Sequence, residues 1–166
     1  MRGEPHLVGR YEIRERLGTG GFASVYRAYD PLLDIERAIK VLHRHLADDP
    51  TIRDRFIREG RALARIRHPN LVQVFDAGEA EGRVYLTMEL VRGTSLEHIL
   101  QERGRLPLPE LVPIVDEVAD ALAAVHAAQL VHRDIKPDNI LLEQGTNRAV
   151  LLDLGKGDDT SPGRTS

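Results

Sequence analysis

The sequence predicts an α+β domain in which most of the strands precede most of the helices. Hydrophobic and polar residues alternate from Tyr11 to Leu17, which is the period of a half-buried strand. Further strands are expected through Tyr29 and at 35–42, 71–75 and 83–89. Only one amphipathic helix, at 51–66, interrupts this region, whereas the longest helix is expected later, at 109–128. Strands gathered before helices are typical of the α+β class.

Composition limits the kinds of protein that this chain can be. Its 166 residues are 42% hydrophobic and 30% charged, as in a globular domain that is long enough to bury a core. The net charge of −3 gives no basic field that would indicate nucleic acid as a partner. The absence of cysteine excludes disulfides, thiolate metal sites and a cysteine nucleophile. No stretch is apolar enough to span a bilayer or to act as a signal segment, so we expect a cytoplasmic protein.

A glycine-rich turn joins the first two strands. Gly18, Gly20 and Gly21 lie between them, and the second strand begins near Val25. Glycines in this position let the backbone approach an anion with its N–H groups, although hairpins also use glycine simply for positive φ. A strand rather than a helix follows the glycines, which disfavours the dinucleotide-binding fingerprint.

A lysine and a glutamate are candidates for an ion pair near this turn. The third strand has Lys40 in an otherwise apolar segment, where the amine either reaches solvent or faces an anion under the glycines. Asp49 and Pro50 predict the start of the helix at 51–66. Glu59 falls on the apolar stripe of that helix, and a carboxylate there needs a partner. We therefore expect Glu59 to pair with Lys40.

The histidines give no sign of a metal centre. There are seven, and they are scattered along the chain. Only His43 and His45 lie close together, and no carboxylate and third histidine complete a zinc pattern around them. We therefore interpret both imidazoles as solvated side chains that take no part in a site.

Two helices and a hairpin are expected in the second half. Thr94 or Ser95 is a suitable N-cap for a short helix. The long helix at 109–128 is followed by a small hairpin made of 140–142 and 150–152. The apolar residues of the long helix recur at helical spacing and form one face, made of Leu111, Ile114, Val115, Val118, Leu122 and Val125.

The loop between the long helix and the hairpin contains an unusual density of chemical groups. Within His132 to Asn139, Asp134 could accept a proton from a hydroxyl and Lys136 could hold a phosphate. Asn139 could offer an amide oxygen to Mg²⁺. The alternative is a polar turn whose charges are solvated. Asp153, after the hairpin, is by itself either a turn former or a metal ligand.

These segments, in this order, resemble the eukaryotic-like protein kinases, most closely the bacterial serine/threonine members. The resemblance runs from about Tyr11 to Gly155 and rests on the glycine turn, strand lysine, helix glutamate, His-Arg-Asp loop and Asp-Leu-Gly motif. It implies a protein-kinase-like fold with a five-stranded antiparallel N-lobe, one main helix in that lobe, and an incomplete, mainly helical C-lobe. The implied parts are an N-terminal extension (1–10), the ATP-binding N-lobe (11–88), the hinge and partial C-lobe (89–155) and the start of an activation segment (156–166).

The resemblance also implies roles for individual residues. Lys40 would hold the α- and β-phosphates of ATP and pair with Glu59. Asp134 would orient the substrate hydroxyl and accept its proton, and Lys136 would neutralise the transferred phosphoryl group. The Mg²⁺ ligands would be Asn139 and Asp153, and ATP would be surrounded by Leu17, Gly18, Thr19, Gly20, Gly21, Phe22, Ala23, Ser24, Val25, Ala38, Lys40, Met88, Glu89, Val91 and Leu141.

The implied activity is transfer of the ATP γ-phosphate to serine and threonine hydroxyls of proteins. The alternative is a stand-alone ATP-binding or interaction module that transfers no phosphate. Eleven residues follow the Asp-Leu-Gly motif, so we expect a truncated chain with a disordered tail and little kinase activity of its own. The helices that usually cover the long helix would then be missing, exposing Leu111, Val118 and Leu122 and favouring self-association.

Overall fold

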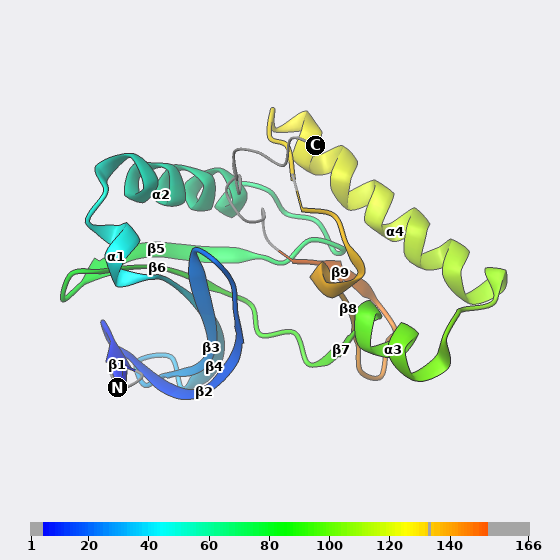
Figure 1. Ribbon diagram of the computed structural model, residues 1–166, viewed down its shortest axis with the longest axis horizontal. Helices are drawn as coiled ribbons and strands as arrows, with labels where there is room; N and C mark the ends of the chain where they lie inside the picture. The colour runs from blue at the N-terminus through cyan, green and yellow to red at the C-terminus, as the bar shows by residue number, and fades with distance from the viewer. Residues whose placement is uncertain (1–4, 133, 153–166) are drawn as a thin grey trace, which may run out of the picture.

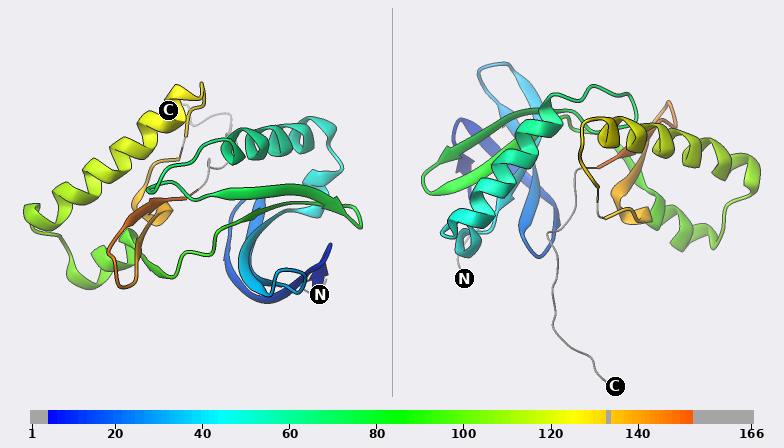
Figure 2. Two further views of the ribbon diagram at one scale, coloured as in Figure 1. Left: turned by 180° about the vertical axis from the view of Figure 1, so that it is seen from behind. Right: turned by 90° about the horizontal axis from the view of Figure 1, so that it is seen from above.

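Residues 5–132 and 134–152 are described by the computed structural model, and they separate into a strand-rich and a helix-rich lobe (Figures 1 and 2). The first lobe is a six-stranded antiparallel sheet in the order β1-β2-β3-β4-β6-β5. This confirms the α+β class and adds one strand to the five that were predicted. The strands are β1 (Leu7–Val8), β2 (Tyr11–Thr19), β3 (Ala23–Asp30), β4 (Ile35–Leu42), β5 (Val74–Ala80) and β6 (Arg83–Met88).

The extra strand, β1, lies in the segment that we expected to form an N-terminal extension. It pairs with the start of β2, and Arg10 in the turn between these two strands reaches the end of β3. Arg10 donates from Nε and Nη2 to the buried carboxylate of Asp30, at 3.0 and 2.9 Å. This hydrogen bond, with further ones from backbone N–H groups, holds the pKa of Asp30 below its ordinary value. Residues just before Tyr11 therefore belong to the sheet.

One long helix, α2 (Pro50–Ala64), packs against this sheet. Its N-terminus is the predicted one, because the Asp49 side chain accepts a hydrogen bond from the Thr51 N–H at 2.9 Å and Pro50 follows it. The short helix α1 (Arg44–Ala47) precedes it and was not predicted, since four residues carry no periodicity. Gly60 allows close packing, because a Cβ there would lie 2.3 Å from Cδ2 of Leu86 on β6.

The second lobe combines two helices with a three-stranded sheet in the order β7-β8-β9. Ser95 is the N-cap of the first helix, and its Oγ accepts from the His98 N–H at 3.1 Å. The predicted hairpin is present. A third strand, β7, was not predicted; it follows the link from the first lobe and pairs antiparallel with β8 of the hairpin (Figure 1). The elements are β7 (Gly93–Ser95), α3 (Leu96–Arg103), α4 (Leu108–Ala127), the 3₁₀ turn η1 (Pro137–Asn139), β8 (Ile140–Glu143) and β9 (Ala149–Leu151).

The exposed side of α4 differs from the one we predicted. Val118, expected to be exposed, is only 7% exposed, because it packs in one cluster with the residues of β9. Leu111 and Leu122 are half-buried. The exposed apolar residues of α4 are Leu108, Val112 and Val115, although the apolar pattern places Val115 on the buried face.

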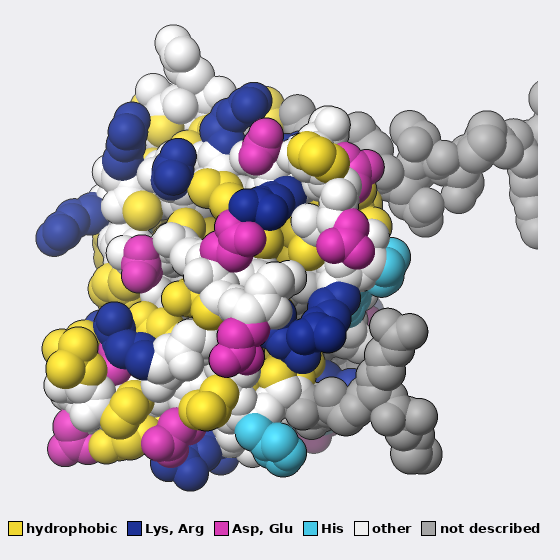
Figure 3. Space-filling model, turned by 90° about the vertical axis from the view of Figure 1, so that its left-hand side faces the viewer, with side chains coloured by type: hydrophobic (Ala, Val, Ile, Leu, Met, Phe, Trp, Pro, Cys, Tyr) yellow, Lys and Arg dark blue, Asp and Glu magenta, His cyan; other side chains and the backbone are white. Residues whose placement is uncertain are grey.

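One face of the molecule carries charges of both signs. On the face formed by the outer end of the strand-rich lobe, lysine and arginine side chains are interspersed with aspartate and glutamate (Figure 3). Among the described residues, no helix combines the length and the apolar character needed to cross a bilayer.

The contact of β7 with β8 predicts a strong effect of one small substitution. A Cβ at Gly93 would lie 2.1 Å from the backbone carbonyl oxygen of Leu142, so Gly93→Ala must separate the two strands. We expect it to lower the free energy of unfolding by about 2 kcal/mol, as overpacking typically does, in urea denaturation. The matched control is Gly18→Ala, where a Cβ meets no atom within 4 Å. Equal stability of both variants would contradict the observed close contact.

Candidate active site

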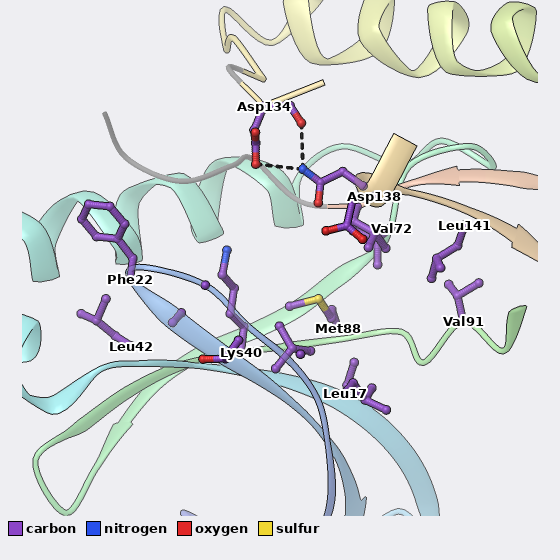
Figure 4. Close-up of a pocket in the computed structure, with 18 of the residues that line it drawn as sticks. Leu17, Phe22, Lys40, Leu42, Val72, Met88, Val91, Asp134, Asp138 and Leu141 are labelled. Carbon is purple, nitrogen blue, oxygen red and sulfur yellow. Dashed lines mark hydrogen bonds between the residues drawn. The ribbon is translucent and has the colours of Figure 1, made fainter. Parts of the chain in front are cut away.

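A cavity of about 480 Å³ lies between the two lobes, and most of the residues singled out in the sequence line it (Figure 4). The described residues Gly21 and Ser24 are not part of its wall. The predicted metal ligand Asp153, the Leu154 and Gly155 that follow it, and the predicted disordered tail lie outside the described residues. The predicted residues that line the cavity are Leu17, Gly18, Thr19, Gly20, Phe22, Ala23, Val25, Ala38, Lys40, Glu59, Met88, Glu89, Val91, Asp134, Lys136, Asn139 and Leu141.

The glycine turn forms one edge of this cavity, where β2 passes into β3. The Gly20 N–H donates to the Ala23 carbonyl oxygen at 2.9 Å and closes the turn. The hydroxyls of Thr19 and Ser24 lie 2.8 Å apart and join the two strand ends. Ser24 thus supports the turn from behind, while Gly21 is exposed at its tip.

His43 also contacts the glycine turn, which corrects our interpretation of it as solvated. Its backbone N–H donates to the Phe22 carbonyl oxygen at 2.8 Å, and its ring Nε2 lies 2.8 Å from the Gly20 carbonyl oxygen. The side chain is half-buried, and its ring stacks on His45. A pattern search would miss this contact, because the partner is a backbone carbonyl 23 positions earlier in the chain.

Lys40 and Glu59 line the same cavity from different elements. Lys40 is on β4 between Val25 and Leu86 of the neighbouring strands, and it extends from the sheet into the cavity (Figure 4). Glu59 Oε1 accepts a hydrogen bond from Arg55 Nε at 3.1 Å. Arg55 and Glu59 are four positions apart on α2, a spacing that predicts such a pair. The expected pairing of Glu59 with Lys40 stays a prediction.

Apolar side chains form much of the wall. Four apolar residues that the resemblance places around ATP line the cavity: Leu17, Val25, Ala38 and Leu141. The sequence did not single out several others. Ile52, Arg55 and Phe56 lie on α2, and most of the rest lie at the ends of strands or in links, where the period of two does not tell which side faces the cavity. The additional lining residues are Leu42, Ile52, Arg55, Phe56, Val72, Leu90, Ser95, Asp138 and Leu152.

The polar loop opposite the sheet is built on a buried histidine. His132 is 1% exposed, and its Nε2 lies 2.8 Å from the Leu152 carbonyl oxygen. Because a carbonyl only accepts, Nε2 must carry the proton, which leaves Nδ1 to accept from the Asp134 N–H at 3.2 Å. The imidazole therefore connects the loop to the end of β9.

Asp134 is oriented by Asn139. The Asn139 Nδ2 donates both to the Asp134 carbonyl oxygen and to Asp134 Oδ2, at 2.8 and 2.9 Å (Figure 4). Lys136 Nζ lies 3.6 Å from the same carboxylate oxygen. These contacts fix a carboxylate beside an amine at the cavity wall, an arrangement that can accept a proton and neutralise an anion. Both hydrogen bonds use the Asn139 Nδ2, so neither involves its amide oxygen, Oδ1.

The segment after α2 positions β9, and through it the polar loop. Asn70 donates from Nδ2 to the Ala149 carbonyl oxygen at 2.9 Å, and its own carbonyl accepts from the Leu151 N–H at 2.8 Å. From the other side, Glu117 of α4 accepts from the Ala149 N–H at 2.8 Å. The last residue described after β9, Leu152, donates its N–H to the Asn139 carbonyl oxygen at 2.8 Å.

The donor set bears on whether the cavity suits a metal ion. Within 5–132 and 134–152, no cluster of three or more histidine, aspartate or glutamate side chains could hold a metal by itself. The groups present at this edge are the Asn139 amide oxygen and the carboxylates of Asp134 and Asp138. Such oxygen donors suit Mg²⁺, which usually takes one or two protein ligands and completes its shell with water and phosphate oxygens.

The chain matches the family model described as the protein kinase domain over residues 11–165. It is 43% identical over 151 residues to the serine/threonine-protein kinase PksC of Streptomyces coelicolor, a match that covers 86% of this chain and 27% of PksC. It is 41% identical over 141 residues to the serine/threonine-protein kinase PrkC of Bacillus subtilis, covering 85% of this chain and 22% of PrkC.

A solved structure has the same arrangement of elements. The kinase domain of PknI from Mycobacterium tuberculosis superposes with a TM-score of 0.79 at 34% sequence identity. The match covers 92% of this chain and 62% of that domain. The chain thus spans about a quarter of the length of the curated relatives and less than two thirds of the solved domain.

The double role of His132 predicts that its replacement destabilises the fold. His132→Leu removes both the donor to Leu152 and the acceptor of the Asp134 N–H, so we expect the free energy of unfolding to fall by about 2 kcal/mol. Urea denaturation measures the change. His98→Leu is the control, because His98 is an exposed residue of α3 that pairs with Glu102 on the surface, and a loss below about 0.5 kcal/mol is expected there. Similar losses in both variants would contradict the bridging role.

Proposed function

Because the chain belongs to the protein kinase family, we propose that it binds Mg·ATP between its lobes and transfers the γ-phosphate to serine or threonine hydroxyls of proteins. The observation that supports this most is that the glycine turn, Lys40, Asp134, Lys136 and Asn139 all line one cavity. These groups are far apart in the sequence, and phosphoryl transfer needs them together because its catalysis is mainly positioning and charge neutralisation.

The apolar end of the cavity would receive the adenine. Leu17 and Leu141 approach from the two lobes, with Met88 behind them. The Glu89 N–H donates to the Gln73 carbonyl oxygen at 2.9 Å, so the Glu89 group that remains for the edge of the base is its carbonyl. An adenine amino group is a donor and suits that carbonyl.

The polar end would receive the phosphates and the metal. Lys40 supplies a positive charge from the sheet, and the glycine turn supplies backbone N–H groups. Asn139 would be one Mg²⁺ ligand, because its Nδ2 is engaged by Asp134 and its Oδ1 is directed elsewhere. Asp153 would be the second ligand by resemblance. Bound Mg²⁺ would neutralise charge on the phosphate oxygens.

Asp134 would act on the substrate hydroxyl. Its carboxylate accepts the hydroxyl hydrogen, which orients an oxygen lone pair toward the γ-phosphorus. As the new oxygen–phosphorus bond forms and the bond to ADP breaks, the proton passes to Asp134. Lys136, 3.6 Å from that carboxylate, supplies positive charge for the transferred group.

A second candidate is a module that binds ATP but transfers no phosphate. The observation that bears on it is the hydrogen bond that Glu59 Oε1 accepts from Arg55, because it occupies one oxygen of the carboxylate that the resemblance assigns to Lys40. The two candidates share the ATP site and differ in phosphate transfer, so they are separated by a transfer assay.

The proposed chemistry also suggests a cellular compartment and a class of substrate. Use of ATP implies the cytoplasm, and the substrates would be proteins with accessible serine or threonine. Self-association through the exposed apolar residues of α4 is a further proposal, which sedimentation velocity over a range of protein concentrations tests.

ATP binding is tested by thermal unfolding with and without Mg·ATP. At a hundredfold excess over Kd, a ligand stabilises by about 2.7 kcal/mol, so we expect Tm to rise by roughly 5 °C or more. Lys40→Met should lose most of this rise, whereas the control Arg44→Met, on the exposed surface of α1, should keep it. No rise in the unsubstituted chain would overturn the proposed nucleotide site.

Phosphate transfer is tested with labelled ATP and a general serine/threonine protein substrate. We expect Asp134→Asn to lower the transfer rate by about 100-fold or more, because an amide cannot accept the proton, while the Mg·ATP-dependent rise in Tm persists. Asp120→Asn, an exposed position on α4, is the control and should transfer at the unsubstituted rate. ATP binding without transfer by the unsubstituted chain would agree with the little activity expected from its sequence, and would favour the second candidate for this chain.

A further inference from the structure

His43 lies outside the glycine turn and contacts it through two separate groups. Its backbone N–H continues the pairing of β4 with β3 as far as the Phe22 carbonyl oxygen, at 2.8 Å. Its ring Nε2 lies 2.8 Å from the Gly20 carbonyl oxygen. Since the carbonyl can only accept, Nε2 is the protonated nitrogen and the imidazole is the donor. The ring also lies nearly parallel to that of His45, with the planes 11° apart and the centroids 5.8 Å apart.

The turn needs such support because it has little packing of its own at its tip. A Cβ at Gly18 or at Gly21 would meet no atom within 4 Å, so neighbouring side chains do not restrict the backbone there. Phe22 does pack against the apolar cluster of Leu42, but it lies on the β3 side of the turn. Glycines lose more conformational freedom on ordering than any other residue, so an unsupported turn would have to be ordered by the ligand at a cost in affinity.

The hydrogen bond from the imidazole fixes a peptide group rather than a side chain. In a trans peptide the C=O and the following N–H point in opposite directions. The ring therefore holds the Gly20 carbonyl, with its partial negative charge, and at the same time sets the direction of the Gly21 N–H. Gly20 itself lines the cavity in which the phosphates would lie.

We propose that His43 is a positioning residue of the phosphate-binding turn, whose imidazole orders the Gly20–Gly21 peptide before nucleotide binds. This inference rests on the proposed ATP site. It assigns His43 an effect on the phosphate end of the ligand and none on the adenosine end, because Gly20 contacts His43 at the tip of the turn. It also explains the half-burial of a histidine that the sequence pattern leaves without a role.

The test compares two ligands that differ only in phosphate. His43→Phe keeps an aromatic ring to stack on His45 but removes the donor, so we expect Kd for Mg·ATP to rise about fivefold, the effect of one ordinary hydrogen bond. Kd for adenosine should change less than twofold. His43→Gln, which retains an N–H donor, should recover part of the affinity for Mg·ATP. His45→Ala, which removes the stacked neighbour but not the donor, is the matched control and should change Kd for Mg·ATP by less than twofold.

A second measurement needs no nucleotide. Amide hydrogen exchange of residues 18–25 should be faster in His43→Phe than in the unsubstituted chain, and close to the unsubstituted rate in His45→Ala. Unchanged exchange in His43→Phe, or an equal loss of affinity for adenosine and Mg·ATP, would overturn the positioning role. If the unsubstituted chain binds no Mg·ATP, the proposed function fails, and the exchange experiment still decides whether His43 orders the turn.

Discussion

The geometry of the cavity depends on the backbone contact between the segment after α2 and β9. The Leu151 N–H donates to the Asn70 carbonyl, and the Leu151 carbonyl accepts from the Val72 N–H. This contact joins the strand-rich lobe to the strand that leads into the polar loop. The loop then takes its position from Leu152, which accepts from His132 and donates to Asn139.

The polar groups of this connection are buried, so each must have a partner. His132 is 1% exposed and Asn70 is 7% exposed. In such surroundings a hydrogen bond is stronger than in water, and a missing partner costs correspondingly more. The network therefore allows few alternative arrangements. Asn139 belongs to it and donates to Asp134, so the position of the Asp134 carboxylate is restricted as well. A carboxylate that is oriented before substrate arrives does not have to be ordered during the reaction.

Much of the fold could be predicted because its signals are local. The N-cap Asp49 and the strands β2, β3, β4 and β6 follow from residues that are neighbours in the sequence, and Ser95 was one of two candidates for the second N-cap. The strand expected at 71–75 is instead β5, at Val74–Ala80. The strands β1 and β7 could not be predicted, because two or three residues have no period, and their pairing depends on partners elsewhere. The expected exposure of Val118 was wrong, because β9 packs in the same cluster and covers that side of α4. Helical spacing had correctly placed Ile114, Val118 and Val125 on the buried face of this helix.

The site shows the same division between chemical groups and their placement. The residues that would do the chemistry, such as Lys40 and Asp134, could be named from the sequence because their side chains are distinctive. What positions them is largely backbone: the Gly20 carbonyl for His43, the Leu152 carbonyl for His132. A motif records side chains, and a carbonyl is the same at every position. Residues that hold the backbone of a site, such as His43, are therefore found by identifying the hydrogen-bond partner of each polar side chain in the structure.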